Sequence, residues 1–459
     1  MKQLKVIGIM VGAVVLLTGS YLLVNARTEK REKQAAAESA PVQLVSFDRD
    51  LASKMLITNE EGEFAFTYAD GTWELDSQEF EINAYAVSTV CNYMSNVSSL
   101  KTVEKDCENL SKYGLDKPIT VTVTTSDGNT YTLLVGDPTP TNESFYVMLP
   151  DQDAVYTIDY DTGAVFCVSR DTLKDLYLFN VNSTEVTHFA LKRDGATIFN
   201  LDHTNEVENA WKMNAPITAD ANSATLSDTL DGFVRVTVAT HIAEHPDNLA
   251  TYGLDKPKYE VEVSTASKTR SIAFGNMISA NDDERYIYGY FTDTKQVFTI
   301  DKEALGFLEA KTVDYLYPYI YTPEISNIKT VDVQCLDTKT KLEIDYSAEK
   351  FVVDGTTFAS DDEDGMQYFY NLYRSIAMLE ISDLNPDAVP DTTKEAVATI
   401  TYTMQDASQV VITLLPASDT TYYVMKDGVY TQLMTRKRYL TDTGSITQRY
   451  NELQKYLKK

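Results

Sequence analysis

A ten-residue segment that occurs twice is the feature that most constrains the fold of this chain. Residues 109–118 read NLSKYGLDKP and residues 248–257 read NLATYGLDKP, with eight identities at an offset of 139 residues. Each copy is followed by an alternating strand, a turn and a second strand that ends at Gly136 or Gly275. Repetition at a fixed period indicates tandem copies of one supersecondary unit. We therefore expect the chain to consist of tandem units of a single kind.

The segments before the two copies also correspond. Two alternating strands joined by a tight turn open each unit, at 55–58 and 64–68 and again at 188–191 and 197–201. The only two tryptophans of the chain follow, 40 residues before Tyr113 and 41 before Tyr252. Apolar residues at helical spacing then predict one amphipathic helix per unit. These residues are Ile82, Ala86, Val90, Tyr93 and Val97 in the first unit, and Leu226, Leu230, Phe233 and Val234 in the second.

A third, weaker copy follows. Alternating strands at 330–333 and 342–346 repeat the opening hairpin, Phe351 stands near the tryptophan position, and 385–391 replaces the YGLDKP turn. Its helix is predicted from Met366, Phe369, Tyr370, Tyr373, Ile376 and Leu379. Terminal repeats are often atypical because they cap the array. The sequence therefore predicts an α+β fold of three tandem related units, each an antiparallel β-meander plus one amphipathic helix. Their predicted bounds are 46–180, 181–322 and, for the degenerate unit, 323–459.

The N-terminus carries an apolar run. Residues 6–24 are 19 consecutive uncharged residues, and a helix of this length rises about 28 Å against a hydrocarbon core of about 30 Å. We expect a signal-anchor transmembrane helix at 6–24, between a cytoplasmic stub at 1–5 and a polar stalk at 25–45. A cleaved signal peptide is the alternative, since residues 24–26 form a passable cleavage site.

The charged residues on either side of this segment bear on its orientation in the membrane. Lys2 and Lys5 precede the span and four basic residues follow it, although Glu29 and Glu32 are interleaved with them. We expect the N-terminus inside and the C-terminal domains outside the cell membrane, the layout of a single-pass signal anchor. Gly8 and Gly12 lie on one face of such a helix with Gly19, where a second helix could approach closely.

The charge balance excludes one class of partner. The chain has 40 basic and 68 acidic residues, a net charge of −28, whereas nucleic-acid binding needs a basic surface. Six basic and two acidic residues lie in the first 33 positions, so the remainder carries 34 basic against 66 acidic residues, a net of −32. Anionic headgroups would repel such a domain, which we expect to stand away from the membrane surface.

The YGLDKP turn places an acidic and a basic residue side by side, but each of its residue types fits a helix stop. Gly114 or Gly253 supplies a left-handed residue after a short helix, the following leucine packs back on that helix, and the proline prevents continuation. We therefore interpret the turn as structural, with Asp116 and Lys117 in solvent.

Residues 241–245 read HIAEH and match H-x-x-E-H, which on a helix places two histidines on one metal-facing side. The first unit has Thr102 and Asp106 at the positions of His241 and His245, and Pro246 would end the helix directly afterwards. We therefore expect ordinary histidines near a helix end and no metal site.

No other pattern predicts chemistry. There is no G-x-S-x-G, no C-x-x-C, and only four histidines and four cysteines, at positions 91, 107, 167 and 335. Cys91 on the first helix and Cys107 at its far end are predicted to be too far apart to bridge, and the cysteines to be small buried hydrophobes. The acidic runs 282–284 and 361–364 lack EF-hand spacing and are interpreted as solvated loops. The sequence thus predicts no catalytic, cofactor-binding or metal-binding residue, no cofactor, and no enzyme.

The pattern as a whole resembles the domain of unknown function 4340 family of bacterial membrane-anchored proteins. The resemblance rests on DGTW at 70–73, AWKMNAP at 210–216 and the two YGLDKP turns at 113–118 and 252–257, and it weakens over the third unit. It implies an extracytoplasmic accessory part of an ABC-type transport system similar to the gliding-motility exporters, with a permease or an extracytoplasmic subunit as partner. No catalytic residues are established for that family.

Three functions therefore remain open. The first is an anchored, non-enzymatic interaction module that engages such a transporter. The second is a cell-envelope protein that binds a glycan or another ligand through some of the 30 tyrosines, although most of these rings are expected to pack in strands with the hydroxyl in water. An envelope hydrolase is the third.

Overall fold

The computed structural model describes residues 24–30, 40–204, 210–280, 283–358 and 361–458. The chain divides into two compact units, Met1–Leu176 and Tyr177–Lys459. Apart from Val24, the predicted cytoplasmic stub and membrane span lie outside the described residues. Within the described ranges, no helix is both long and apolar enough to cross a membrane.

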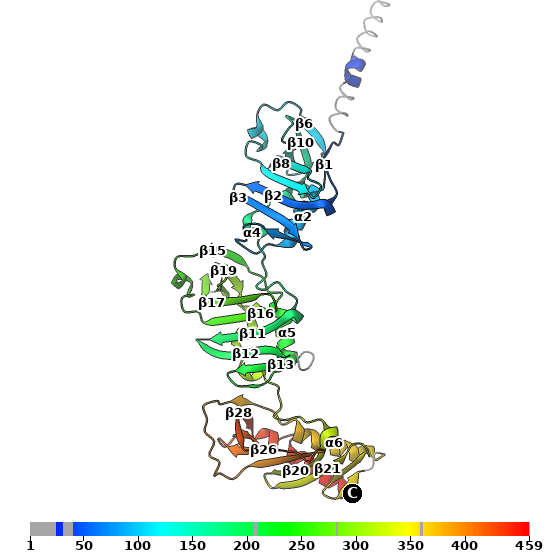
Figure 1. Cartoon of the computed structure of the whole chain (residues 1–459), viewed down its shortest axis with the longest axis vertical. Coiled ribbons are helices and arrows are strands. Elements are labelled where there is room, and N and C mark those ends of the chain that lie inside the picture. The colour runs from blue at the N-terminus through cyan, green and yellow to red at the C-terminus, as the bar shows by residue number, and fades with distance from the viewer. Residues whose placement is uncertain (1–23, 31–39, 205–209, 281–282, 359–360, 459) are drawn as a thin grey trace, which may run out of the picture. The chain divides into compact units, whose positions relative to one another are not determined.

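The first unit contains an eight-stranded antiparallel sheet (Figure 1). In order across the sheet, its strands are β4 (Thr72–Leu75), β3 (Gly62–Ala69), β2 (Ala52–Asn59), β7 (Ile119–Thr125), β8 (Thr130–Pro138), β9 (Ser144–Met148), β10 (Val155–Asp159) and β6 (Lys101–Glu104). A separate two-stranded sheet pairs β1 (Gln43–Ser46) with β5 (Asn96–Ser98).

The second unit contains two nine-stranded antiparallel sheets. The strands of its first sheet are β14 (Ala219–Asp220), β13 (Ala210–Ala215), β12 (Ala196–Thr204), β11 (Val186–Arg193), β16 (Tyr259–Thr265), β17 (Thr269–Ala280), β18 (Asp283–Phe291), β19 (Gln296–Asp301) and β15 (Thr240–Glu244). Those of its second sheet are β23 (Thr356–Phe358), β22 (Lys350–Val353), β21 (Thr338–Asp345), β20 (Ile328–Cys335), β25 (Ala398–Met404), β26 (Gln409–Pro416), β27 (Thr421–Lys426), β28 (Val429–Arg436) and β24 (Asp383–Leu384).

The three large sheets share one strand order. Each sheet consists of two meanders that are joined side by side. The first strand of the first meander pairs with the first strand of the second, as β2 with β7, β11 with β16 and β20 with β25. A short strand between the long helix and the second meander lies at the far edge of each sheet, as β6, β15 and β24. Alternating residues of the central strands are buried, because period-two patterning turns one face of each sheet inward. The predicted α+β class with antiparallel meanders is thus confirmed.

One long helix accompanies each sheet. The N-cap residue of each is an asparagine or aspartate whose side-chain oxygen accepts a backbone hydrogen bond, as is common at helix N-termini. These helices are α2 (Ala84–Met94) after Asn83, α5 (Ser223–Phe233) after Asn222 and α6 (Glu363–Ala377) after Asp362. The predicted amphipathic helices are confirmed, but their predicted ends are too long. Val97 belongs to β5, and Leu379 lies beyond the end of α6. The apolar spacing continues past both helix ends, but the chain leaves the helix there.

The prediction of a single helix per sheet is wrong for the first and third sheets. Further α-helices are α3 (Tyr160–Phe166), α4 (Arg170–Leu173), α7 (Arg438–Thr441) and α8 (Ile446–Leu457). The 3₁₀ helices are η1 (Arg49–Leu51), η2 (Leu110–Tyr113), η3 (Ser183–Glu185), η4 (Leu249–Tyr252), η5 (Lys302–Glu309), η6 (Thr312–Tyr315) and η7 (Ile325–Asn327). Most of these are shorter than two turns, too short for a periodic apolar pattern to identify.

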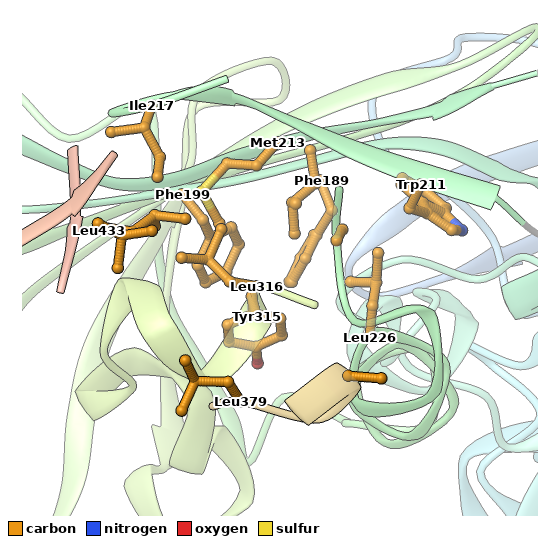
Figure 2. Packing of buried hydrophobic residues seen from close by; sticks show 14 of the residues in the cluster. Phe189, Phe199, Trp211, Met213, Ile217, Leu226, Tyr315, Leu316, Leu379 and Leu433 are labelled. Atoms are coloured by element: carbon orange, nitrogen blue, oxygen red, sulfur yellow. The ribbon is translucent and has the colours of Figure 1, made fainter. Parts of the chain in front are cut away.

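The core of the second unit lies between its sheets and these helices. Figure 2 shows part of it, with Phe189 of β11, Phe199 of β12, Met213 of β13 and Leu226 of α5 packed around Tyr315 of η6. Trp211 of β13 lies at the edge of this group, with its indole nitrogen directed away from the other labelled side chains (Figure 2).

Candidate functional site

The repeated YGLDKP turn is a structural element, as its residue types predict. Gly114 and Gly253 adopt the left-handed conformation with φ of 67° and 69°, directly after η2 and η4. The next residue closes each turn: Leu115 N–H donates to Leu110 O and Leu254 N–H to Leu249 O, both at 3.0 Å. The acidic and basic residues of both turns, at 116, 117, 255 and 256, are exposed.

A second glycine in each copy explains why the turn lies so close to the sheet. A Cβ at Gly136 of β8 would overlap Tyr113 O, and one at Gly275 of β17 would overlap Tyr252 O. Leu115 and Tyr113 can therefore pack beside Met148 and Val155 under the first turn. Both copies thus share a backbone-to-backbone contact with the sheet, whereas their Asp–Lys pairs lie in solvent.

The H-x-x-E-H segment is a strand, so the helix expected there is wrong. His241 and Glu244 lie in β15, which pairs with β19, and His245 follows with φ of 47°. Strand residues rise about 3.3 Å each, which separates residues four apart by about 13 Å. The motif needs both imidazoles on one helical turn, an arrangement that this strand does not provide. The described residues contain no group of three or more His, Cys, Asp or Glu placed to hold a metal ion.

The four cysteines occupy unlike environments and are all free thiols. Cys91 and Cys335 are buried as expected, and burial raises the pKa of each thiol to about 11. Cys167 is exposed and Cys107 half-buried, so the expectation of small buried hydrophobes is wrong for these two. Cys107 lies beyond β6, not on the first helix, because α2 already ends at Met94.

The acidic run at 361–364 has a structural role at its centre. Asp362 caps α6 by accepting a hydrogen bond from Gly365 N–H at 3.0 Å. The Tyr456 hydroxyl group also donates a hydrogen bond to the Asp362 carboxylate, at 2.8 Å. Of the run at 282–284, Asp282 and the side chains of Asp283 and Glu284 lie outside the described structure.

The two tryptophans line equivalent cavities. The first tryptophan pocket has a volume of about 330 Å³ and is formed by η1, β2, the hairpin of β3 and β4, and α2. Its lining residues are Arg49, Asp50, Ala52, Tyr68, Trp73, Ser88 and Cys91. Trp73 is opposite Tyr68 in the β3–β4 register, with ring centroids 5.3 Å apart.

The second tryptophan pocket has a volume of about 160 Å³ and uses the same elements of the next sheet, namely η3, β11, β12, β13 and α5. Its lining residues are Ser183, Thr184, Val186, His203, Trp211, Ser223, Ser227, Leu230 and Asp231. Trp211 is opposite His203, with ring centroids 5.4 Å apart, just as Trp73 is opposite Tyr68.

An aromatic side chain fills the corresponding position of the third sheet. Cys91, Leu230 and Tyr370 each lie eight residues after the N-cap of their helix. The Tyr370 ring lies 5.8 Å from that of Phe351, which takes the tryptophan position in β22. The larger Tyr370 side chain thus lies against Phe351 at the helix position where Cys91 and Leu230 line pockets.

The tryptophan pockets offer hydrogen-bonding groups around an apolar wall. Trp73 and Trp211 are only 5% and 8% exposed. Within the described residues neither indole N–H makes a hydrogen bond, and neither is fully enclosed, so each remains open to solvent or a ligand. Arg49 and Asp50 pair at 3.2 Å over the first pocket, and Ser183 donates to Asp231 over the second. Such a site suits a small hydroxyl-bearing group.

A comparison with protein families identifies what this chain is. The model of DUF4340, described as a domain of unknown function, matches residues 73–209 and 211–400. The chain belongs to this family. No curated protein matches the chain.

The limits of the 4340-family match coincide with features of the fold. Its two segments begin at Trp73 and Trp211, the residues that line the two pockets. The second segment ends at Ile400 in β25, before β26–β28, α7 and α8. Sequence reasoning found the equivalence of the two tryptophans but missed the pockets. One signal in the sequence could have revealed the pockets. Cys91 and Leu230 have smaller side chains than Tyr370, which stands at the same helix position in the third sheet.

Proposed function

We propose that this member of the 4340 family is a membrane-anchored, extracytoplasmic accessory protein of an ABC-type, gliding-like transport system, without enzymatic activity of its own. In this proposal a helix at 6–24 crosses the membrane once, and three tandem related units follow outside the cell. The stalk predicted at 25–45 is shorter, because Gln43–Ser46 forms β1 and Leu44 and Val45 are buried in the first unit's core. The strand order common to the three large sheets carries the proposal, because tandem copies of one module are typical of proteins that present binding surfaces to partners.

Two further observations support it. The uncharged run at 6–24 has the length of a membrane span. The acidic surplus of the rest of the chain, 66 acidic against 34 basic residues, disfavours nucleic acids and anionic membrane surfaces as partners. The transporter itself is inferred from the family resemblance, with a permease or an extracytoplasmic subunit as the contact.

The full chain with a C-terminal tag is expected to stay in the membrane pellet after alkaline washing and to purify from detergent together with a multi-span permease and its ATPase. Mass spectrometry of the purified material identifies both subunits. A variant that lacks residues 1–33 is the matched control and should appear in the soluble fraction. Recovery of no transporter subunit, with retention of the protein on isolated wall polymer, would contradict the proposal.

Binding of an envelope glycan or another hydroxyl-rich ligand is the second candidate function, and the tryptophan pockets favour it. Both tryptophans of the chain lie in these pockets, so a ligand that enters should change intrinsic tryptophan fluorescence when wall-polymer fragments are added. The double substitution Cys91→Tyr, Leu230→Tyr should abolish the fluorescence change. Tyr370 shows that an aromatic ring fits at this helix position.

Melting temperatures of the doubly substituted protein and of Tyr370→Phe, a substitution in the filled position, serve as controls. A fluorescence change that persists in a folded Cys91→Tyr, Leu230→Tyr protein would exclude the pockets as the binding site.

A further inference from the structure

A cavity beside the third sheet collects positive charge in an otherwise acidic chain. It has a volume of about 450 Å³ and lies among α6, α7 and the start of α8. Each helix contributes one arginine to its lining, Arg374, Arg438 and Arg449. We call this space the arginine cavity. Glu380 and Asp442 are its only acidic lining residues, so the lining as a whole is positive despite the chain's net charge of −28.

Among the described residues, two of the three guanidinium groups make no ion pair within 4 Å, although the charges of Glu380 and Asp442 act on Arg438. Arg438 donates from Nη2 to Tyr439 Oη at 2.9 Å and stacks on that ring, while Arg374 makes no ion pair. Arg449 pairs with Glu452 at 2.8 Å, and Glu452 does not line the cavity. By contrast, Arg170, Arg270 and Arg285 are each paired with a carboxylate. Arg374 and Arg438 therefore retain free donor capacity.

The loop between α7 and α8, residues 442–445, forms one wall of the cavity. Gly444 has φ of 85°, a conformation that other residues rarely adopt. A Cβ at this position would lie 3.9 Å from Nη2 of Arg449. Ser445 caps α8 by accepting a hydrogen bond from Gln448 N–H, so the positive end of the twelve-residue helix dipole also lies at the cavity wall.

We propose that the arginine cavity binds a phosphate group. A guanidinium group presents planar, forked donors that match phosphate or carboxylate oxygens. Three such groups from three helices surround one space, which fits the several oxygens of a phosphate better than the two of a single carboxylate. The phosphate belongs either to a small soluble molecule or to the headgroup of a single lipid held in the cavity, and neither requires docking on an anionic membrane surface. This inference is independent of the transporter and glycan proposals.

The test uses the full chain in non-ionic detergent and isothermal titration calorimetry. Inorganic phosphate is titrated at constant ionic strength, with chloride as the comparison anion, and a short-chain phosphatidylglycerol below its micelle concentration is titrated separately. Binding of inorganic phosphate identifies a small soluble ligand, and binding of the short-chain lipid alone identifies a headgroup. Either result supports the cavity as a phosphate site.

The doubly substituted protein Arg374→Gln, Arg438→Gln should bind the effective probe at least about tenfold more weakly, because it loses two charge-assisted donors. Both side chains belong to exposed residues without an ion pair, so folding should be retained, which circular dichroism checks. Arg436→Gln removes one positive charge at the end of β28, outside the cavity lining, and is the matched control for Arg374→Gln and for Arg438→Gln, each also made alone.

Three outcomes would overturn the proposal. One is that neither probe binds more tightly than chloride. Another is that the doubly substituted protein binds as tightly as the wild type. The last is that Arg436→Gln weakens binding as much as the cavity substitutions do, which would assign the effect to overall charge.

Discussion

Replacing Gly275 by alanine is expected to destabilise the second large sheet by about 3 kcal/mol, because the added methyl group would overlap the carbonyl oxygen of Tyr252. The same methyl would lie 2.9 Å from the carbonyl carbon of Gly253, so no flexible side chain can move to relieve the contact. The turn must therefore lift from β17. Hydrogen exchange measured by mass spectrometry should show faster exchange in η4 and around Gly275 in the middle of β17.

Two further substitutions test this explanation. Gly136→Ala in the first sheet should have the same effect on η2 and β8, since its methyl would overlap Tyr113 O. Gly232→Ala in α5 is the control: nothing lies within 4 Å of the added methyl, and alanine favours a helix over glycine by about 1 kcal/mol. Wild-type exchange rates in Gly275→Ala would show that the close contact is not needed.

Raising the pH from about 9 to about 12 is expected to unfold the third large sheet before the others. Burial raises the pKa of Tyr373 to about 12, and burial followed by the nearby Tyr423 raises that of Tyr430 to about 12. Burial, together with Tyr373 and Tyr321, also raises the pKa of Tyr402. These groups lie in α6, β28 and β25, all in the region of the third sheet.

The sign follows from proton binding. An unfolded tyrosine loses its proton near pH 10, whereas folded Tyr373 keeps it to about pH 12. The stabilisation is therefore complete below pH 10 and is lost as the pH rises toward 12. Two pKa units correspond to about 3 kcal/mol for Tyr373, which is only 8% exposed.

The Tyr373→Phe variant should lose less stability across this pH range than the wild type. It also removes the hydrogen bond from Tyr373 Oη to Pro323 O at 3.1 Å, which should lower stability at neutral pH by a roughly constant 1 kcal/mol. Scanning calorimetry across the pH series measures both effects. Tyr346→Phe is the control, since Tyr346 is 48% exposed in the same sheet region. Equal pH slopes for the wild type and Tyr373→Phe would rule out this titration as the cause.

The elements that the sequence predicts well are those whose signal is local. Alternation places the residues of β2, β3, β11 and β12 correctly, and the glycine, leucine and proline of YGLDKP describe the turns that form. The strand β15 was missed because its five residues alternate half-buried and exposed, so that no apolar stripe marks them. The H-x-x-E-H motif then favoured a helix that edge pairing with β19 overrides.

The cavities could not be predicted because they depend on non-local packing. Strands β24–β28 lie between Arg374 and Arg449 in the sequence. Both residues line the same cavity only because α6 packs against α8. The tryptophan pockets likewise combine a 3₁₀ turn, a strand and a helix. Repetition shows that Trp73 and Trp211 are equivalent, but only the folded structure shows that each of them lines a cavity.

The filled position at Tyr370 has an evolutionary consequence. One helix residue, cysteine, leucine or tyrosine, distinguishes the three copies at this point, while the strand order stays the same. A single codon change can thus open or close a pocket without disturbing the scaffold around it. A change at this helix position can therefore alter the pocket beside one sheet and leave the other two sheets as they are.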